Sequence, residues 1–341
     1  MMTPPSHWNS RGPAAIALLP LSALWGLASW WRRASARPLR ASIPVICVGN
    51  LSVGGTGKTP IVAWLYEQLT ERGWHPAILT RGYGGKLAGP LWVDGSIHDA
   101  AACGDEPLML ADGVLGEGRN VMVARDRKAG AKAITASGKF DLIIMDDGLQ
   151  NPYLYKDVSI GVFDGSAGAG NGWLIPAGPL RTRLGHGMKM LDMIVVNGAD
   201  ETGLNASIPP DIASFEARLR PDIMVGEQLA GKSLLAFAGI GRPARFFDSV
   251  EAAGGVIVHQ LAFADHHPYS QHDLTRLQED AQRLGADLIT TQKDWVRLPA
   301  EWRSQIAVLP VSLELDDNDR MLAMLEAYLA AASDNREAGA G

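Results

Sequence analysis

The residues of this chain that are best suited to chemistry lie in a glycine-rich segment near its start. It reads Ser52-Val53-Gly54-Gly55-Thr56-Gly57-Lys58-Thr59, follows the apolar run Ile43–Val48 and precedes a helix-like apolar stretch. A strand, a glycine-rich turn ending in Gly-Lys-Thr and a helix predict a P-loop whose backbone N–H groups face phosphates. Lys58 would neutralise the terminal phosphates and Thr59 would ligate Mg²⁺. Ser52 stands where the pattern has glycine, and the alternative is a glycine-rich turn with a surface lysine.

Two adjacent carboxylates follow another apolar run. Asp146 and Asp147 end the stretch that begins at Asp141, and Gly148 comes next. In a P-loop sheet an aspartate at such a strand end can hold Mg²⁺ directly or through water. We expect Asp146, Asp147 or both to serve the metal, whereas an ordinary Asp-Asp-Gly turn is the alternative.

A candidate general base lies at the start of a predicted helix. Asp105, in the segment Gly104–Pro107, suits a helix N-cap, but it could also take a proton from a substrate hydroxyl. His266 follows a strand of the second half of the chain. A loop histidine is usually solvated, but His266 could orient Asp105 or relay its protons if two domains close over one cleft.

Further polar residues are weaker candidates. Arg125 and Arg181 could pair with substrate phosphate, although single arginines are more often structural. The glycine loop 81–85 suggests a close backbone approach, or a mobile loop without a ligand. Lys293 and Asp294 faintly resemble a base-reading Lys-x-Asp element. Residue type does not settle the role of these two.

Composition limits the class of protein. The chain has 341 residues, 47% of them hydrophobic, which is enough for about two domains. Its net charge of −6 implies no nucleic-acid partner. Its two cysteines, Cys47 and Cys103, argue against a disulfide framework and against a zinc site.

Apolar runs alternate with helical segments, which predicts a doubly wound, mostly parallel α/β sheet with ligands beyond the carboxyl ends of its strands. Strands are expected at 43–48, 77–80, 121–124, 142–145, 159–163, 193–196, 233–238, 256–261, 288–291 and 306–313. Helices are expected at 60–72, 106–112, 127–137, 243–253, 271–284 and 317–332. Residues 200–229 look like a polar connection. We expect a P-loop domain over 42–229, a smaller α/β domain over 230–332 and a tail over 333–341.

The N-terminal region, 1–41, departs from the pattern of a soluble domain. Residues 14–31 carry no charge, and Arg32, Arg33, Arg37 and Arg40 follow. A signal peptide is disfavoured because its positive charges would precede the apolar run. A transmembrane helix and a core helix are alternatives. We favour a helix lying in the membrane interface, with its arginines on the cytoplasmic side.

Several motifs in order make the pattern more specific. They are Val48–Pro60, Arg81–Gly85, Gly104–Pro107, Asp146–Gln150, Asn171–Arg181, Val195–Gly198, Ala238–Gly241, Ala264–His266 and Thr291–Asp294. With this set, from about residue 14 to 300, the chain resembles the tetraacyldisaccharide 4′-kinase family, the lipid A 4′-kinases of Gram-negative bacteria.

The resemblance implies transfer of the ATP γ-phosphate, with Mg²⁺, to the 4′-hydroxyl of an acylated glucosamine disaccharide 1-phosphate. It implies a peripheral or monotopic protein at the cytoplasmic face of the inner membrane, with no obligate protein partner. Asp105 and His266 would be its catalytic pair, and Gln150 a polar neighbour of the acidic strand end. Asn151 and Thr182 depart from the family pattern.

Two other classes remain as alternatives. One is a P-loop NTPase switch or a metallochaperone-type GTPase, and the other is a membrane adaptor with a vestigial P-loop.

Overall fold

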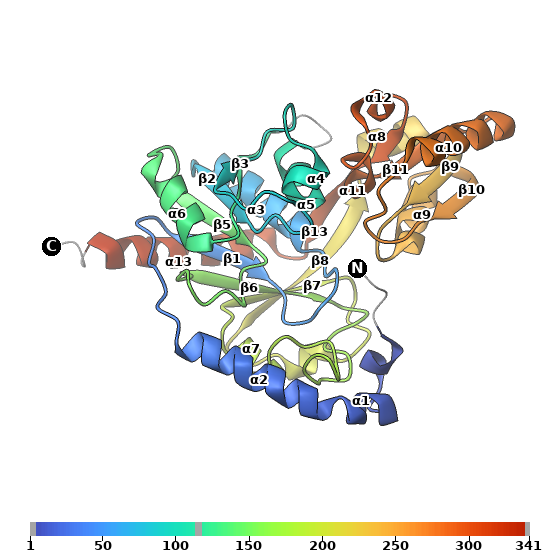
Figure 1. Ribbon diagram of the computed structural model, residues 1–341. Coiled ribbons are helices and arrows are strands. Elements are labelled where there is room, and N and C mark those ends of the chain that lie inside the picture. Colours follow the sequence, from blue (N-terminus) through green and yellow to red (C-terminus); the bar gives the residue numbers. More distant parts are fainter. Residues whose placement is uncertain (1–4, 113–117, 338–341) are drawn as a thin grey trace.

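A computed structural model describes residues 5–112 and 118–337 of the chain. Its strands form two sheets, one of nine strands and one of four (Figure 1). The larger sheet carries the P-loop, and the smaller one forms a separate unit beside it. The predicted α/β architecture with a mostly parallel main sheet is confirmed.

The larger sheet has the order β13-β8-β7-β6-β1-β5-β2-β4-β3. Its strands are β1 (Val45–Gly49), β2 (Pro76–Thr80), β3 (Leu91–Trp92), β4 (Val121–Val123), β5 (Leu142–Asp146), β6 (Val158–Asp164), β7 (Met193–Asn197), β8 (Ala213–Pro221) and β13 (Val311–Leu315). The pairs β3–β4 and β8–β13 at the two edges are antiparallel, and the others are parallel. Strands β1, β2, β5, β6 and β7 are buried along their whole length, as their continuous apolar runs predict.

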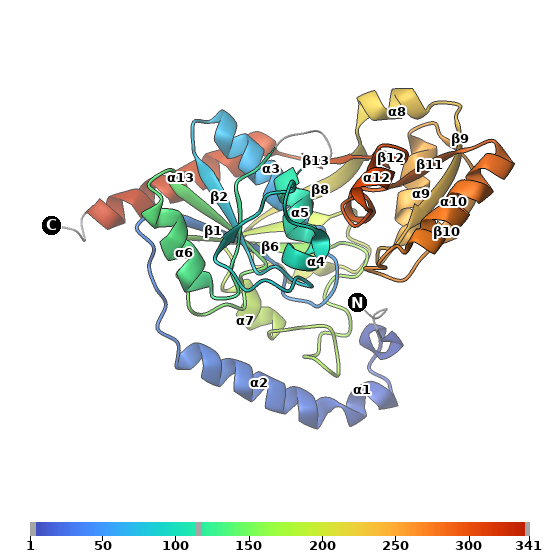
Figure 2. The same ribbon diagram turned by 45° about the horizontal axis from the view of Figure 1, so that its top comes forward.

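Helices cover both faces of this sheet (Figure 2). One face packs against α3 (Lys58–Glu71), α13 (Asn318–Glu337) and part of α5 (Asp105–Asp112). The other packs against α6 (Arg127–Ala136) and α7 (Leu184–Met188). Two short helices, α4 (Ala100–Cys103) and the 3₁₀ turn η2 (Leu204–Ser207), lie in connections.

The smaller sheet is parallel and has the order β10-β9-β11-β12. Its strands are β9 (Ser233–Ala238), β10 (Val256–Ala262), β11 (Asp287–Thr291) and β12 (Ala307–Leu309). Its helices are α9 (Pro243–Ala252), α10 (Gln271–Leu284), α11 (Gln292–Trp295) and α12 (Ala300–Arg303). Two apolar clusters, one on each face of β9, form its core.

The structure corrects two expected elements. The segment expected as a polar connection contains β8 and α8 (Ile223–Leu229). The single strand expected at 306–313 is two strands in different sheets, β12 and β13, which are separated at Pro310. Proline has no N–H to donate to a ladder, so the chain can leave one sheet there and join another. Its carbonyl accepts from the N–H of Asp222.

The chain therefore returns to the larger sheet at its end. Strand β13 pairs with β8, and α13 buries Met321, Leu322, Leu325 and Leu329 in the same core as β1. Residues 311–337, which the expected division assigned to the smaller domain and the tail, thus pack with the P-loop sheet. Residues 338–341 of the expected tail lie outside the described residues.

The apolar N-terminus forms the turn η1 (Ser6–Asn9), α1 (Pro13–Ala17) and α2 (Leu19–Ala34), and α2 runs along the outside of the larger unit (Figure 1). The helix breaks at Leu18 because Pro20 has no N–H to donate to the turn before it. Within 5–112 and 118–337, none of the helices is long and apolar enough to cross a membrane.

Candidate phosphoryl-transfer site

The P-loop connects β1 to α3 in the predicted way. Gly57, just before α3, has a φ of 84°, in the left-handed region that favours glycine. A Cβ at Gly57 would also lie 2.2 Å from Nδ2 of Asn197, at the end of β7. That Nδ2 donates to the carbonyl of Thr56 at 3.3 Å. Asn197 therefore supports the loop from a strand that is not adjacent to β1.

Two more segments hold the loop. The N–H of Val53 donates to the carbonyl of Pro179 at 2.8 Å, and the side chain of Gln150 donates to the carbonyl of Asn50 at 2.7 Å. In contrast, a Cβ placed on Gly54 or Gly55 would meet no described atom within 4 Å. The loop is thus fixed by the protein on one side and open on the side where phosphates would bind.

The two carboxylates lie beside this loop but in different environments. Asp146 ends β5 opposite Val48 of β1 and is buried, and its Oδ2 accepts from the Thr80 hydroxyl at 3.2 Å. Its Oδ1 is buried and has no hydrogen-bond partner among the described residues. Asp147 turns out of the strand at a φ of 48°, and its carboxylate lies 3.8 Å from Nζ of Lys58 and 3.2 Å from Nη1 of Arg181.

These environments shift the pKa values of Asp146 and Asp147 in opposite directions. Burial raises the pKa of Asp146 to about 7, and the charges of Glu106 and Asp147 add to the shift, while Lys58 opposes it. Burial also opposes ionisation of Asp147, but Lys58 and Arg181 outweigh it and hold the pKa of Asp147 below its ordinary value. Asp147 is therefore ionised at neutral pH, whereas Asp146 is still partly protonated near pH 7, where a nearby cation would favour its ionised form.

This end of the sheet fits Mg²⁺. The unpartnered Oδ1 of Asp146 is a hard oxygen ligand. Thr59, whose hydroxyl is the other expected ligand, is the second residue of α3 and directly follows Lys58. Protein sites usually give Mg²⁺ only one or two carboxylates, and phosphates and water complete its shell. In the described ranges no group of three or more His, Cys, Asp or Glu could hold a metal.

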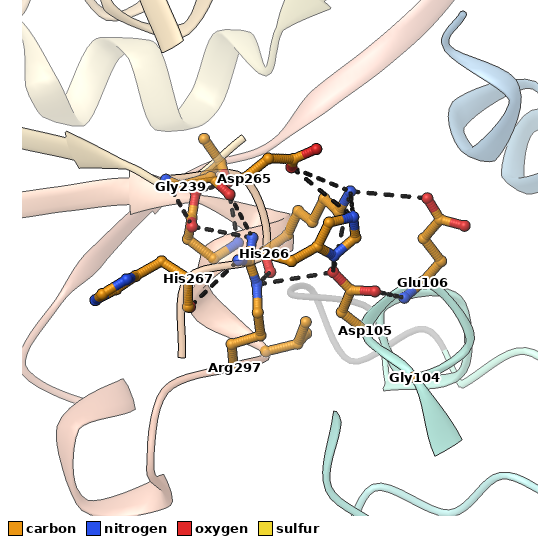
Figure 3. A network of polar contacts seen from close by, with 12 residues as sticks. Gly104, Asp105, Glu106, Gly239, Asp265, His266, His267 and Arg297 are labelled. Atoms are coloured by element: carbon orange, nitrogen blue, oxygen red, sulfur yellow. Dashed lines mark hydrogen bonds and ion pairs between the residues drawn. The ribbon is translucent and has the colours of Figure 1, made fainter. Parts of the chain in front are cut away.

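The structure brings Asp105 and His266 together from the two units (Figure 3). Oδ2 of Asp105 lies 2.8 Å from Nδ1 of His266. Asp105 is the first residue of α5 rather than the residue before it, and its Oδ1 accepts from the N–H of Glu106 at 3.0 Å. His266 follows β10 with a φ of 59°, and its N–H donates to the carbonyl of Gly239 at 3.0 Å.

Asp105 is ionised at neutral pH. It is buried, which opposes its charge, but the hydrogen bond from His266 and the positive charges of Lys293 and Arg297 prevail and lower the pKa of Asp105. A carboxylate in this state can accept a proton from an incoming hydroxyl. Glu106, its neighbour, is close enough to raise the pKa of Asp146, so this pair and the acidic strand end share one electrostatic site.

The three weaker candidates for substrate binding, Arg125, Gln150 and Arg181, do not all lie in one place. Nη1 of Arg181 donates to the Asp147 carboxylate and to Oε1 of the Gln150 side chain, each at 3.2 Å, so Arg181 and Gln150 lie together at the acidic strand end. Arg125 instead donates to the carbonyls of Gly85 and Lys86 at 2.9 and 3.2 Å. Its guanidinium holds the glycine loop 81–85, away from that group.

Sequence reasoning missed the supporting roles of Thr80 and Asn197. Each is a polar residue at the carboxyl end of an otherwise apolar strand, which is the only local signal. Arg127, the first residue of α6, is buried and donates to the carbonyls of Ala124 and Asp146 at 2.6 and 3.2 Å. It therefore supports the backbone beneath the carboxylate pair.

Comparison with known proteins gives one consistent family. A family model described as tetraacyldisaccharide-1-P 4′-kinase matches residues 14–330. Curated relatives named tetraacyldisaccharide 4′-kinase include one from Methylobacterium nodulans, 47% identical with 97% of this chain and 96% of the relative covered. One from Rhodospirillum centenum is 42% identical with 99% and 100% covered. The crystal structure of LpxK from Aquifex aeolicus in complex with ATP matches with a TM-score of 0.76 and 25% identity, covering 92% of this chain and 99% of that one.

Proposed function

Because the chain belongs to the tetraacyldisaccharide-1-P 4′-kinase family, we propose that its P-loop and its Asp105–His266 pair handle the two substrates of one phosphoryl transfer. The enzyme is an ATP-dependent lipid A 4′-kinase. It phosphorylates the 4′-hydroxyl of a tetraacylated glucosamine disaccharide 1-phosphate. The NTPase-switch and metallochaperone alternatives are not favoured.

The observation that carries the assignment of roles is the 2.8 Å contact between Asp105 and His266. It places a buried, ionised carboxylate where the two units meet, electrostatically linked to the metal-binding end of β5 through Glu106. Asp105 accepts the proton of the sugar hydroxyl while the hydroxyl oxygen forms a bond to the γ-phosphorus of ATP. The bond between the γ-phosphorus and the β-phosphate oxygen breaks, and ADP leaves. His266 holds the carboxylate in place.

The P-loop residues Ser52–Thr59 bind the triphosphate, and Lys58 balances the charge of the transferred group. Lys58 lies 3.8 Å from Asp147, which keeps its ammonium at the acidic strand end. Thr59 and Asp146 would hold Mg²⁺, which neutralises phosphate charge when bound. Arg181 and Gln150 remain candidates for substrate phosphate, and Arg125 acts by supporting the glycine loop.

The N-terminal helices would bring the enzyme to its lipid substrate. Along α1 and α2, large apolar side chains are between 36% and 67% exposed, namely those of Ile16, Leu19, Leu21, Leu24, Trp25, Leu27, Trp30 and Trp31. Arg32 and Arg33 lie in the last turn of α2. An apolar face with tryptophans and a basic end suits the membrane interface, here the cytoplasmic face of the inner membrane.

A transfer assay tests the roles. The enzyme is incubated with γ-labelled ATP, Mg²⁺ and detergent-dispersed tetraacyldisaccharide 1-phosphate, and label in lipid and in inorganic phosphate is counted. Asp105→Ala should lower lipid labelling by at least about 10²-fold, typical for the loss of a general base, while ATP still binds. Asp211→Ala, an exposed aspartate between β7 and β8, is the control and should keep full activity.

Two outcomes would contradict the proposal. Undiminished lipid labelling by Asp105→Ala would remove Asp105 as the base. Label released only as inorganic phosphate by the unaltered enzyme would favour a nucleotide-driven switch instead.

A further inference from the structure

Lys293, whose role its residue type leaves open, lies where the two units meet. It is the second residue of α11, and its Nζ is 3.3 Å from Nε2 of His266, the ring nitrogen that faces away from Asp105. We propose that Lys293 is a positioning residue of this kinase: its ammonium donates a hydrogen bond to Nε2 of His266 and thereby fixes the ring in the form that carries its proton on Nδ1. The inference rests on the proposed function, because it concerns the same catalytic pair.

The proton arrangement follows from the donors and acceptors. A lysine ammonium has three donors and no acceptor, so its contact with Nε2 is favourable only if Nε2 carries a lone pair. A neutral imidazole with an unprotonated Nε2 has its proton on Nδ1. At 2.8 Å from Oδ2, that Nδ1–H donates to the Asp105 carboxylate. A doubly protonated ring would instead point an N–H at the ammonium.

The surrounding charges keep the ammonium in this place. Its Nζ lies 4.0 Å from Oδ2 of Asp105, 3.8 Å from Oε1 of Glu106 and 3.9 Å from Oδ1 of Asp265. None of these is a close hydrogen bond, so the ammonium is centred among three carboxylates from α5 and from the segment after β10. The side chain is 23% exposed, so these charges act with limited screening by water.

The backbone under Lys293 is held by its neighbour. Asp294 is fully buried and accepts from the Tyr269 hydroxyl at 2.7 Å and from the Gly239 N–H at 2.9 Å. Gly239 also accepts from the N–H of His266. Asp294 therefore ties the start of α11 to the same backbone segment that positions His266, which fixes the spacing between lysine and histidine.

Arg297 is the other cation facing Asp105, but its donors are committed elsewhere. Its Nε lies 3.8 Å from Oδ2 of Asp105 and donates to the Lys293 carbonyl, and its Nη2 bonds Asp294 and the Gly239 carbonyl. Arg297 thus fixes backbone, whereas Lys293 presents its charge to the outer edge of the His266 ring. Removing Lys293 should free the ring to adopt the other tautomer.

Nitrogen NMR of the full-length enzyme tests the tautomer without any assay of turnover. In ¹⁵N-labelled protein, two-bond ¹H–¹⁵N spectra distinguish a protonated ring nitrogen from an unprotonated one, and the signals that vanish in His266→Gln identify His266. We expect a protonated Nδ1 and an unprotonated Nε2 at pH 8. A His266 ring with its proton on Nε2, or on both nitrogens, would overturn the proposal. Because this result needs no catalysis, it is independent of whether Asp105 proves to be the base.

Three variants test the consequence. Lys293→Met should change the His266 spectrum toward the Nε2-protonated form and lower kcat by about 10-fold, a usual cost of losing an orienting partner, with KM for ATP within twofold. Lys293→Arg, which can still donate to Nε2, should restore the wild-type spectrum and most of kcat. Lys232→Met, an exposed lysine of the same unit, is the control. An unchanged His266 tautomer in Lys293→Met would refute the inference even if kcat fell.

Discussion

The ionisation of Asp146 makes the unfolding free energy of the protein depend on pH. Since burial raises the pKa of Asp146 to about 7, the folded state binds more protons than the unfolded state between the ordinary carboxyl value and pH 7. Stability should therefore fall as pH rises through that window. Without Mg²⁺, we expect unfolding free energy to decrease by about 1 kcal/mol from pH 6 to pH 8 through this group.

Urea unfolding in EDTA at the two pH values measures this decrease. Asp146→Asn, which cannot ionise, should lose the Asp146 share of the pH dependence and be more stable than the wild type at pH 8. Thr80→Val, which removes the hydroxyl that bonds Oδ2 but keeps the carboxyl, is the control and should retain a pH dependence. An equal slope in Asp146→Asn and wild type would show that Asp146 is not the group responsible.

At the scale of single elements, α2 packs against the larger unit with one side and exposes apolar side chains on another. Its inner side is small and polar: the Ser22 hydroxyl donates to the Leu174 carbonyl at 2.8 Å, and a Cβ on Gly26 would lie 3.1 Å from Leu174. Leu24 and Leu27 are 63% and 61% exposed. The face that would meet lipid therefore contributes little to folding and can be altered without loss of the protein.

Vesicle binding tests this face. Leu24→Asn with Leu27→Asn should reduce binding to vesicles of mixed anionic phospholipid by about 10-fold, because each buried leucine contributes on the order of 1.5–3 kcal/mol, only part of which is realised at an interface. The melting temperature should stay unchanged. Ile97→Asn with Leu284→Asn, exposed apolar residues elsewhere, is the matched control. Equal sedimentation of the two double variants with vesicles would remove α2 from membrane binding.

Elements were predictable where the signal is local. The sequence predicts β1, β5 and the P-loop because buried parallel strands are continuous apolar runs and because the turn has a fixed composition. β8 was missed because its buried and exposed residues are mixed and its second half is polar, so it looks like a loop. Its partner β13 lies far along the chain, and only the tertiary fold shows that Pro310 separates two sheets.

The same limit applied within the site. Lys58, Asp105 and Asp146 stand in recognisable motifs, so their chemistry could be predicted from residue type and position. The support given by Asn197 to Thr56 and by Lys293 to His266 depends on how distant segments meet. No period or spacing in the sequence encodes these distances.

At the scale of the whole molecule, the C-terminal helix completes the core of the P-loop unit. Leu325 of α13 is fully buried there. Leu325→Ala should therefore destabilise the P-loop unit by about 3 kcal/mol, within the usual range for a buried leucine. In hydrogen-exchange measurements, Leu325→Ala should increase the exchange rates of β1 and α3 over those of the wild type more than it increases the rate of β9. Glu326→Ala, an exposed neighbour, should have almost no effect; faster exchange confined to the smaller unit would contradict the shared core.

The two units also meet through a group of ion pairs centred on Asp164. Asp164 at the end of β6 is buried, and Nη1 of Arg242, just before α9, lies 2.6 Å from its Oδ2. Arg245 of α9 reaches the same carboxylate at 3.4 Å. Because the proposed catalytic pair draws one residue from each unit, its geometry depends on how the units are held, and this ion-pair group is a further contact that holds them.

Replacing both arginines by alanine should therefore lower kcat/KM for the lipid by about 10-fold, as expected when catalytic groups lose their alignment, with ATP binding nearly unchanged because the P-loop lies wholly in the larger unit. The decrease in kcat/KM should come from the lost contact between the units and not from the removal of two positive charges. Arg276→Ala with Arg283→Ala removes equal charge from side chains that are 75% and 74% exposed on α10, and it should leave turnover intact. Equal turnover in the two double variants would show that the Asp164 contact does not set the position of His266 relative to Asp105.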